Sequence, residues 1–193
     1  MANPHSGVNP SAWLQRWQGL LPAVGTALDV ACGRGRHLHW LAARGLRCTG
    51  IDRDEAALAA APAGAQKVCA DIESGPWPLH PGRQFDLVLV TNYLWRPLWP
   101  QLLASVGPGG LLVYETFASG NETVGKPSRP DFLLQPGELL QRCASLRVLG
   151  YEDGFLGSPS RFVQRIVAVR EARGPSLGES GQDGAPRRYP LPD

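Results

Sequence analysis

The sequence has little of what marks a membrane, secreted or nucleic-acid-binding protein. No apolar run approaches the roughly 18–20 residues that cross a bilayer. Lys and Arg total 19 against 17 Asp and Glu, so the net charge is only +2. Residues 1–12 also lack the basic start and apolar stretch of a secretion signal. We therefore expect a cytoplasmic protein with no membrane or nucleic-acid partner.

Cysteine is scarce and follows no metal-binding pattern. The four cysteines, Cys32, Cys48, Cys69 and Cys143, show no CxxC spacing, and three of them fall in or beside expected strands. This distribution is typical of buried free thiols in a reducing compartment rather than of a disulfide framework or a metal site. We expect no bound metal.

Apolar runs and helical patterns alternate along most of the chain. The expected strands are residues 26–31, 46–52, 66–71, 85–91 and 111–117. The expected helices between them are residues 36–45, 54–61 and 96–106. This alternation predicts a parallel sheet with helices on both faces. Two later apolar runs, 146–153 and 161–172, have only a loop between them, so they are expected to pair antiparallel.

A chain of 193 residues supports one domain with a full core. We expect that single domain at residues 1–172, beginning with a short amphipathic helix at about 11–18 for which Ser11 is the N-cap. Residues 173–193 are rich in Gly, Pro, Ser and charge, which predicts a disordered tail.

The stretch LDVACGRGRH, residues 28–37, carries the main functional signal. An apolar strand there ends near an acid, Asp29, and a glycine turn then opens a helix. A dinucleotide-binding turn would need a third glycine at position 38, which is Leu38, and no P-loop motif is present. A ligand with a cationic centre and no phosphate at the turn suits Asp29. S-adenosylmethionine fits, because it has a sulfonium, an ammonium group and a ribose with two free hydroxyls.

The same stretch resembles the first motif of class I S-adenosylmethionine-dependent methyltransferases. GIDRD (50–54), ADIES (70–74), FDLVLVTNYL and VGPGGLLVYE resemble the later strands of that family in order, and the likeness covers residues 25–170. It implies a Rossmann-like α/β fold: a doubly wound seven-stranded sheet, mostly parallel, with a C-terminal antiparallel hairpin. Within the family, CGRGRH and the loop after YETF look most like the small tellurite-resistance and thiopurine-type methyltransferases.

The resemblance also implies a set of cofactor-binding residues. Asp29 would accept from the methionine ammonium, and Asp52 from both ribose hydroxyls. Two positions depart from the usual glycine pattern: Ala31 replaces the first glycine and Arg36 the third, which places a cation near the methionine carboxylate. The full expected set is Asp29, Ala31, Gly33, Gly35, Arg36, Asp52, Arg53, Asp71, Ile72 and Thr91.

The acceptor is expected beneath the loop of residues 118–135, because ligands of open parallel sheets bind beyond the carboxyl ends of the strands and long loops in compact domains are often functional. No acid–base constellation is evident, so the residues are expected to act mainly by positioning, with Tyr93 and Glu115 as candidates. The expected acceptor-binding residues are Trp13, Tyr93, Trp95, Asn121, Lys126 and Arg129.

These observations favour an S-adenosylmethionine-dependent methyltransferase that acts on a small molecule with a soft sulfur, selenium or tellurium nucleophile. The alternative is a protein that binds S-adenosylmethionine without catalysis. A nicotinamide oxidoreductase is disfavoured by Leu38. The identity of the acceptor and the oligomeric state are left open.

Overall fold

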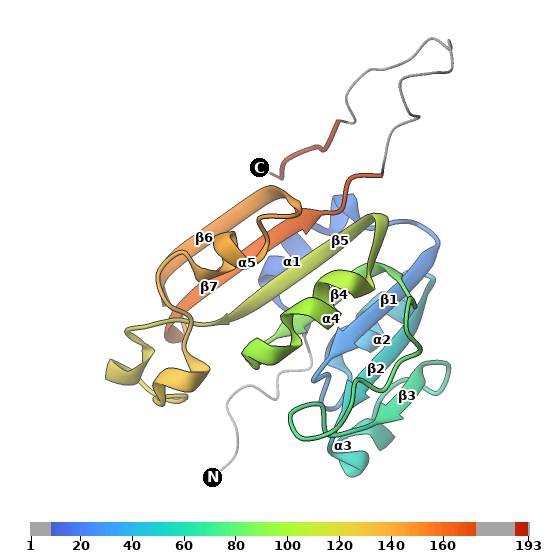
Figure 1. Ribbon diagram of the computed structural model, residues 1–193, viewed down its shortest axis with the longest axis horizontal. Helices are drawn as coiled ribbons and strands as arrows, with labels where there is room; N and C mark the ends of the chain where they lie inside the picture. Colours follow the sequence, from blue (N-terminus) through green and yellow to red (C-terminus); the bar gives the residue numbers. More distant parts are fainter. Residues whose placement is uncertain (1–8, 173–187, 193) are drawn as a thin grey trace.

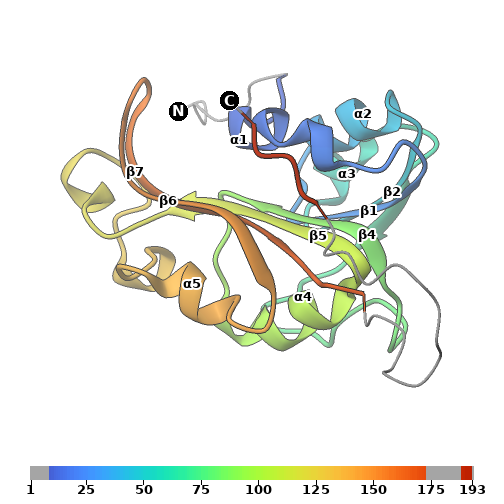
Figure 2. The same cartoon turned by 90° about the horizontal axis from the view of Figure 1, so that it is seen from above.

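The computed structural model describes residues 9–172 and 188–192. One sheet crosses the molecule, and helices cover both of its faces (Figures 1 and 2). Its strands are β1 (Gly25–Val30), β2 (Leu46–Asp52), β3 (Gln66–Cys69), β4 (Phe85–Thr91), β5 (Val106–Phe117), β6 (Arg147–Gly157) and β7 (Ser160–Val169). The α-helices are α1 (Ala12–Arg16), α2 (Arg36–Ala42), α3 (Glu55–Ala59), α4 (Trp99–Ser105) and α5 (Glu138–Arg142).

The seven strands follow the order β3-β2-β1-β4-β5-β7-β6. The first five are mutually parallel, whereas β7 runs antiparallel to both β5 and β6. The expected fold class, a doubly wound and mostly parallel sheet with a C-terminal antiparallel hairpin, is confirmed. The chain order reverses between β1 and β4, and ligands of such sheets bind at this switch point.

Two hydrophobic clusters lie on opposite faces of the sheet because successive strand residues point to opposite sides. In β4, Val88 and Val90 join the cluster that includes Trp99 and Leu102 of α4. Leu87 and Leu89 join the cluster that includes Leu38 and Leu41 of α2, together with Trp13 and Leu14 of α1. Figure 2 shows α1, α2 and α3 on one side of the sheet, with α4 and α5 on the other.

The N-terminal helix α1 begins at the residue that its sequence predicts. The Ser11 hydroxyl accepts from the backbone N–H groups of Trp13 and Leu14, at 3.1 and 3.4 Å, as expected of an N-cap. The helix is shorter than predicted, and a 3-10 turn (Gln18–Leu20) follows it. The buried Trp13 indole donates to the carbonyl oxygen of Ile166 in β7 at 3.3 Å, so α1 packs firmly on the sheet.

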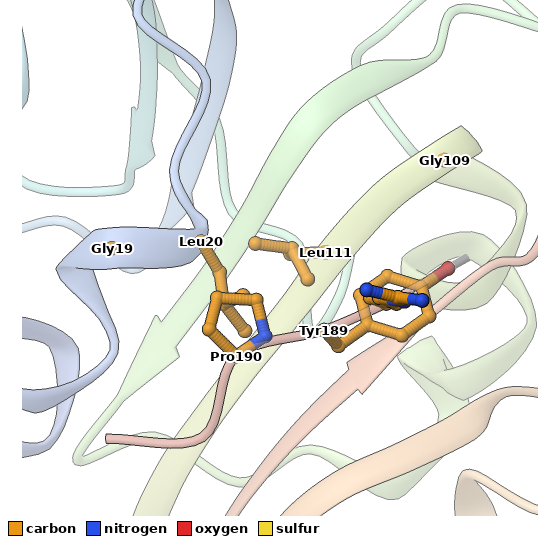
Figure 3. A pocket seen from close by; sticks show the side chains of 7 residues that line it. Gly19, Leu20, Gly109, Leu111, Tyr189 and Pro190 are labelled. Carbon is orange, nitrogen blue, oxygen red and sulfur yellow. The ribbon is translucent and has the colours of Figure 1, made fainter. Parts of the chain in front are cut away.

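The last described residues return to the body of the protein. Tyr189 packs against the hydrophobic cluster of the α1 face, and the Arg147 guanidinium lies 5.6 Å from the centre of its ring. Residues 188–190 line a hollow with Gly19, Leu20, Gly109 and Leu111 (Figure 3). That hollow lies at the amino end of β5. The remaining part of the predicted tail, residues 173–187 and 193, lies outside the described residues.

Candidate functional site

Acidic and polar side chains gather at the carboxyl ends of four neighbouring parallel strands. Val30 of β1 pairs with Ile51 of β2 and with Val90 of β4, and Thr91 pairs with Glu115 of β5. The strand ends are therefore level across the sheet, which brings Asp29, Asp52, Thr91 and Glu115 to one edge. This is the edge at which ligands of such sheets bind.

The turn after β1 leaves open space beside its backbone. Ala31, Gly33 and Gly35 all have left-handed backbones, with φ of 56°, 54° and 73°. A Cβ at Gly33 would meet no atom within 4 Å, whereas one at Gly35 would lie 2.9 Å from the Cβ of Ala61. Gly33 can therefore face a ligand, and Gly35 allows close packing against the segment after α3.

Asp52, at the end of β2, is held by two backbone groups. Its Oδ2 accepts from the Gly33 N–H at 2.6 Å, and its Oδ1 from the Asp54 N–H at 2.9 Å. Each carboxylate oxygen can accept more than one hydrogen bond. The half-buried carboxylate is thus fixed in position and can still bind a pair of hydroxyl groups.

The segment after β3 forms a third acidic position. Asp71 accepts from the Glu73 N–H at 2.9 Å and from the Ser74 hydroxyl at 2.8 Å. These hydrogen bonds, the backbone bond from Glu73 first, hold the pKa of Asp71 below its usual value. Tyr93 lies near this segment, and its burial followed by the charge of Glu73 raises the pKa of its hydroxyl. The side chain of the intervening Ile72 is buried, and Arg53 is exposed.

Asp29 is the most deeply buried acid at this edge. Its side chain is 1% exposed, and among the described residues neither of its oxygens has a hydrogen-bond partner. The Nδ1 atom of the equally buried His37 lies 3.4 Å from the Asp29 Oδ2 atom. The His37 Nε2 atom accepts from the Ser11 N–H at 3.2 Å. An accepting nitrogen carries no proton, so the proton of the ring is on Nδ1, and the contact of Nδ1 with Asp29 is not a hydrogen bond in this structure.

Glu115 is buried on the same face of the sheet. Its Oε1 accepts from the Ser11 hydroxyl at 3.3 Å and lies 3.8 Å from an Nη atom of Arg161. Its Oε2 lies 3.6 Å from an Nη atom of Arg165, but this oxygen has no hydrogen-bond partner among residues 9–172 and 188–192. The carboxylate is thus surrounded by cations that do not fully satisfy it.

Arg36 completes this group of charges. Burial lowers the pKa of its guanidinium, the charges of Asp29 and Glu115 oppose that effect, and the charge of Arg161 adds to it. Arg36 therefore lies within electrostatic reach of the other three residues. We call Asp29, Arg36, Glu115, Arg161 and Arg165 the inner charged cluster.

The residues expected to bind an acceptor lie in different surroundings. Trp13 is buried in the sheet interface, and its indole faces the Arg165 guanidinium at 4.8 Å. Tyr93 and Trp95 are partly buried against the hydrophobic cluster of the α4 face. The structure therefore separates Trp13 from this pair, on opposite faces of the sheet.

The loop of residues 118–135 projects beyond the carboxyl end of β5 (Figure 1). Asn121 is buried and holds the loop together, because it donates to the Pro127 carbonyl oxygen at 3.0 Å and accepts from the Phe162 N–H at 3.2 Å. Lys126 is exposed. Arg129 is also exposed and pairs with Asp131 at 2.9 Å.

Sequence reasoning did not single out Ser11, Arg161 or Arg165 as site residues. One signal was available: Arg161 and Arg165 are four residues apart in a strand, so they share a face. That face carries the buried Val163 and Val167 as well. Two arginines on an otherwise apolar strand face indicate a buried acid or a ligand.

The described residues offer no metal site and no membrane span. They contain no group of three or more His, Cys, Asp or Glu side chains arranged to hold a metal ion. None of the described helices is long and apolar enough to cross a bilayer. Burial raises the pKa of the Cys48 thiol to about 11, so this cysteine stays protonated.

Comparison with known proteins identifies the type of domain. Residues 27–108 match the family model for a methyltransferase domain. This span includes the turn after β1, Asp52 and the segment after β3. No curated protein sequence matches the chain.

Solved structures share the fold at low sequence identity. An S-adenosylmethionine-dependent methyltransferase from Mesorhizobium loti has a TM-score of 0.66 at 19% identity, with 85% of this chain and 100% of that chain covered. A second one, from Methanosarcina mazei, has a TM-score of 0.65 at 15% identity, with 86% and 100% covered. TehB from Haemophilus influenzae has a TM-score of 0.62 at 18% identity, with 76% of this chain but only 58% of TehB covered.

The domain match and the fold together indicate an enzyme that uses S-adenosylmethionine as its methyl donor. The geometry fits this cofactor. A buried acid that has no hydrogen-bond partner among the described residues lies beside a turn with open space at Gly33, and a fixed carboxylate, Asp52, follows on the next strand.

Proposed function

We propose that this protein transfers the methyl group of S-adenosylmethionine to a small-molecule acceptor. The observation that carries the proposal is the buried Asp29 carboxylate, whose oxygens have no hydrogen-bond partner among the described residues. A buried ionised group is costly unless it is paired, so this position favours a cationic ligand. The methionine end of the cofactor has an ammonium group that would meet this need.

Each strand end has a distinct role in holding the cofactor. Asp29 accepts from the ammonium, and Arg36 pairs with the methionine carboxylate. Asp52, already fixed by two backbone N–H groups, accepts from the two ribose hydroxyls. Asp71 accepts from the adenine amino group, the Ile72 backbone N–H donates to a ring nitrogen, and Arg53 flanks the adenine.

The turn and the neighbouring strand complete the cofactor site. Ala31, Gly33 and Gly35 allow the backbone to approach the ligand, and Thr91 lies at the end of the adjacent β4. The turn joins β1 directly to α2, and Thr91 ends β4, so regular secondary structure holds these groups in place before the ligand binds.

When bound, S-adenosylmethionine would supply the methyl group of its sulfonium to the nucleophile of the acceptor and leave as S-adenosylhomocysteine. The protein contributes alignment and exclusion of water, which suffice for a soft nucleophile that arrives already deprotonated. Tyr93, which follows β4, and Glu115 of β5 are the polar side chains that we expect to position the acceptor.

We propose a sulfur, selenium or tellurium nucleophile as the acceptor, in the manner of the tellurite-resistance and thiopurine-type enzymes. The sequence resemblance at CGRGRH and the shared fold of TehB support this choice. Trp13, Tyr93, Trp95, Asn121, Lys126 and Arg129 are the acceptor-side residues of this proposal. Asn121 acts by holding the loop, since both ends of its amide group bond to backbone.

Two measurements test the proposal. Calorimetry with S-adenosylhomocysteine should show saturable binding of one molecule per chain. Incubation of S-adenosylmethionine with thiols, selenite, tellurite and small amines should release S-adenosylhomocysteine with at least one of the soft acceptors. Tight binding without release for any acceptor would favour the non-catalytic alternative, and absence of binding would contradict both.

A further inference from the structure

Arg161 is the cation of the inner charged cluster that has a buried donor atom without a partner among the described residues. Its side chain is only 18% exposed, and the one ion pair that it makes within residues 9–172 and 188–192, with Glu115, is long at 3.8 Å. The Nε atom is buried and has no hydrogen-bond partner in the described part of the chain. A buried charged donor left without a partner carries a desolvation cost, so a ligand with a negative charge would be stabilised beside it.

The neighbouring charges do not neutralise Arg161. Arg165 donates to Glu152 at 2.7 Å, and Glu152 also accepts from Arg16 at 2.7 Å. Glu152 is therefore shared by two arginines, and Glu115 lies between Arg161 and Arg165. The cluster holds more guanidinium groups than carboxylates, so one negative charge is missing.

The missing negative charge is near Arg161, away from the turn after β1 where the methionine end of the cofactor is proposed to bind. Arg36 follows the turn after β1, where the methionine end of the cofactor is proposed to bind. Arg161 belongs to β7, which is separated from β1 by β4 and β5 in the strand order. Because Val163 of β7 pairs with Phe117, the last residue of β5, Arg161 lies just beyond the carboxyl end of β5, where it can meet a second molecule.

We propose that the methyl acceptor carries a carboxylate or another oxyanion, and that Arg161 binds this group. The inference rests on the proposed function, and it adds the chemical class of the substrate. In this arrangement Glu115 keeps Arg161 in place and leaves the Nε–H and an outer Nη–H free for the anion. Arg161 positions the acceptor, while the nucleophilic atom is elsewhere in the same molecule.

A matched pair of acceptors tests this inference. 3-Mercaptopropionate and 3-mercaptopropionamide have the same thiol and length but differ in charge. We expect wild-type protein to prefer the carboxylate by about 10-fold or more in kcat/KM, because the buried Arg161 forms a charged hydrogen bond with the carboxylate and not with the amide. Arg161→Gln should abolish this preference, and Arg161→Lys should restore part of it. Arg147→Gln, which removes an exposed arginine of β6, is the matched control and should keep the preference.

Binding of S-adenosylhomocysteine separates this inference from the proposed function. It should change by less than about 2-fold in Arg161→Gln if the residue meets only the acceptor. A fall of 10-fold or more would show that Arg161 holds the cofactor and would overturn the inference while supporting the proposed function. A preference that survives in Arg161→Gln, or equal use of both thiols by the wild type, would overturn it too.

If neither thiol is methylated, an equilibrium measurement decides. Protein saturated with S-adenosylhomocysteine should bind propionate, but not propionamide, in a saturable way that Arg161→Gln removes. Absence of propionate binding by the wild type would overturn the inference. Thermal melting of each variant shows whether a loss reflects misfolding. Protein that binds no S-adenosylhomocysteine at all would contradict the proposed function itself.

Discussion

The two halves of the carboxyl edge satisfy their charged groups in different ways. In the half formed by β2 and β3, Asp52 and Asp71 accept hydrogen bonds from backbone N–H groups two to nineteen residues away. In the half formed by β1, β5 and β7, Asp29 and Glu115 are more deeply buried, and both have oxygens without hydrogen-bond partners among the described residues.

The carboxylates of the first half are therefore satisfied without a ligand, whereas the charged groups of the second half need a ligand to pair with them. The acids of the first half are fixed by their own loops, so they can receive a nucleoside with little rearrangement. The charges of the second half are costly to bury while unpaired, so their stability depends on what binds there. Substitutions in the first half should therefore reduce the affinity for S-adenosylhomocysteine. Substitutions in the second half should reduce that affinity and raise the free energy of unfolding of the free protein.

The largest effect is expected for Asp52→Ala. The variant loses the proposed hydrogen bonds to both ribose hydroxyls, as well as the acceptor that fixes the Gly33 N–H. Loss of charge-assisted bonds costs about 1.5–3 kcal/mol, which corresponds to roughly 10- to 150-fold weaker binding of S-adenosylhomocysteine by calorimetry. Unchanged affinity would remove Asp52 from the site.

Asp86→Ala is the matched control for that variant. Asp86 accepts from the N–H and hydroxyl of Thr26 at 2.8 and 2.9 Å, but it lies at the amino end of the sheet. We expect it to lower stability and to leave the affinity for S-adenosylhomocysteine unchanged. A similar loss of affinity in both variants would mean that the Asp52 effect arises from general destabilisation.

Asp29→Asn tests the half that a ligand completes. Removing a buried charge should raise the free energy of unfolding of the free protein by about 1 kcal/mol. Binding of S-adenosylhomocysteine should weaken by about 10-fold, because the amide no longer attracts the ammonium. Denaturant unfolding and calorimetry on one preparation would measure both. A variant less stable than the wild type would mean that the contact with His37 already stabilises the buried charge of Asp29.

The same division explains how much of the site the sequence predicts. Asp52 lies 19 residues beyond Gly33, and both belong to one strand–turn–helix–strand pattern that local periodicity reveals. The inner charged cluster is assembled over longer separations: Ser11 and Glu115 are 104 residues apart. No local pattern places α1 over β5 and β7, so Arg161 and Arg165 were missed, whereas the strands and the antiparallel C-terminal hairpin were predicted well.

The loop of residues 118–135 shows the limit of arguing from length and composition. Its charges suggested contact with the acceptor, but its structure depends on contacts that the sequence does not display. Asn121 binds backbone groups of two segments, and Arg96 holds the loop by donating to the carbonyl oxygens of Asp131 and Leu133, both at 2.9 Å.

Ala31→Gly tests the turn that joins the two halves. The left-handed backbone of Ala31, with φ of 56°, is strained for a residue with a side chain, at about 1–2 kcal/mol. Glycine relieves that strain, although its freer unfolded chain offsets part of the gain. We expect the free energy of unfolding to rise by about 0.5–1 kcal/mol in denaturant melts. A loss of stability would mean that the Ala31 methyl group makes packing contacts worth more than the strain.

The smallest effect is expected for the double variant Lys126→Ala, Arg129→Ala. Both side chains are exposed, so we expect their charges to attract the acceptor weakly through solvent and not to contact it directly. We expect kcat/KM for an anionic acceptor to fall by only about 2- to 5-fold, mainly through slower association, with unchanged affinity for S-adenosylhomocysteine. High salt should abolish the difference between variant and wild type, because it screens the attraction of distant charges.

A fall in kcat/KM greater than about 50-fold that persists in high salt would show that the loop closes directly on the acceptor. Lys126 and Arg129 would then bind the anionic group of the acceptor, and the buried Arg161 Nε atom, which has no hydrogen-bond partner among the described residues, would need a different explanation.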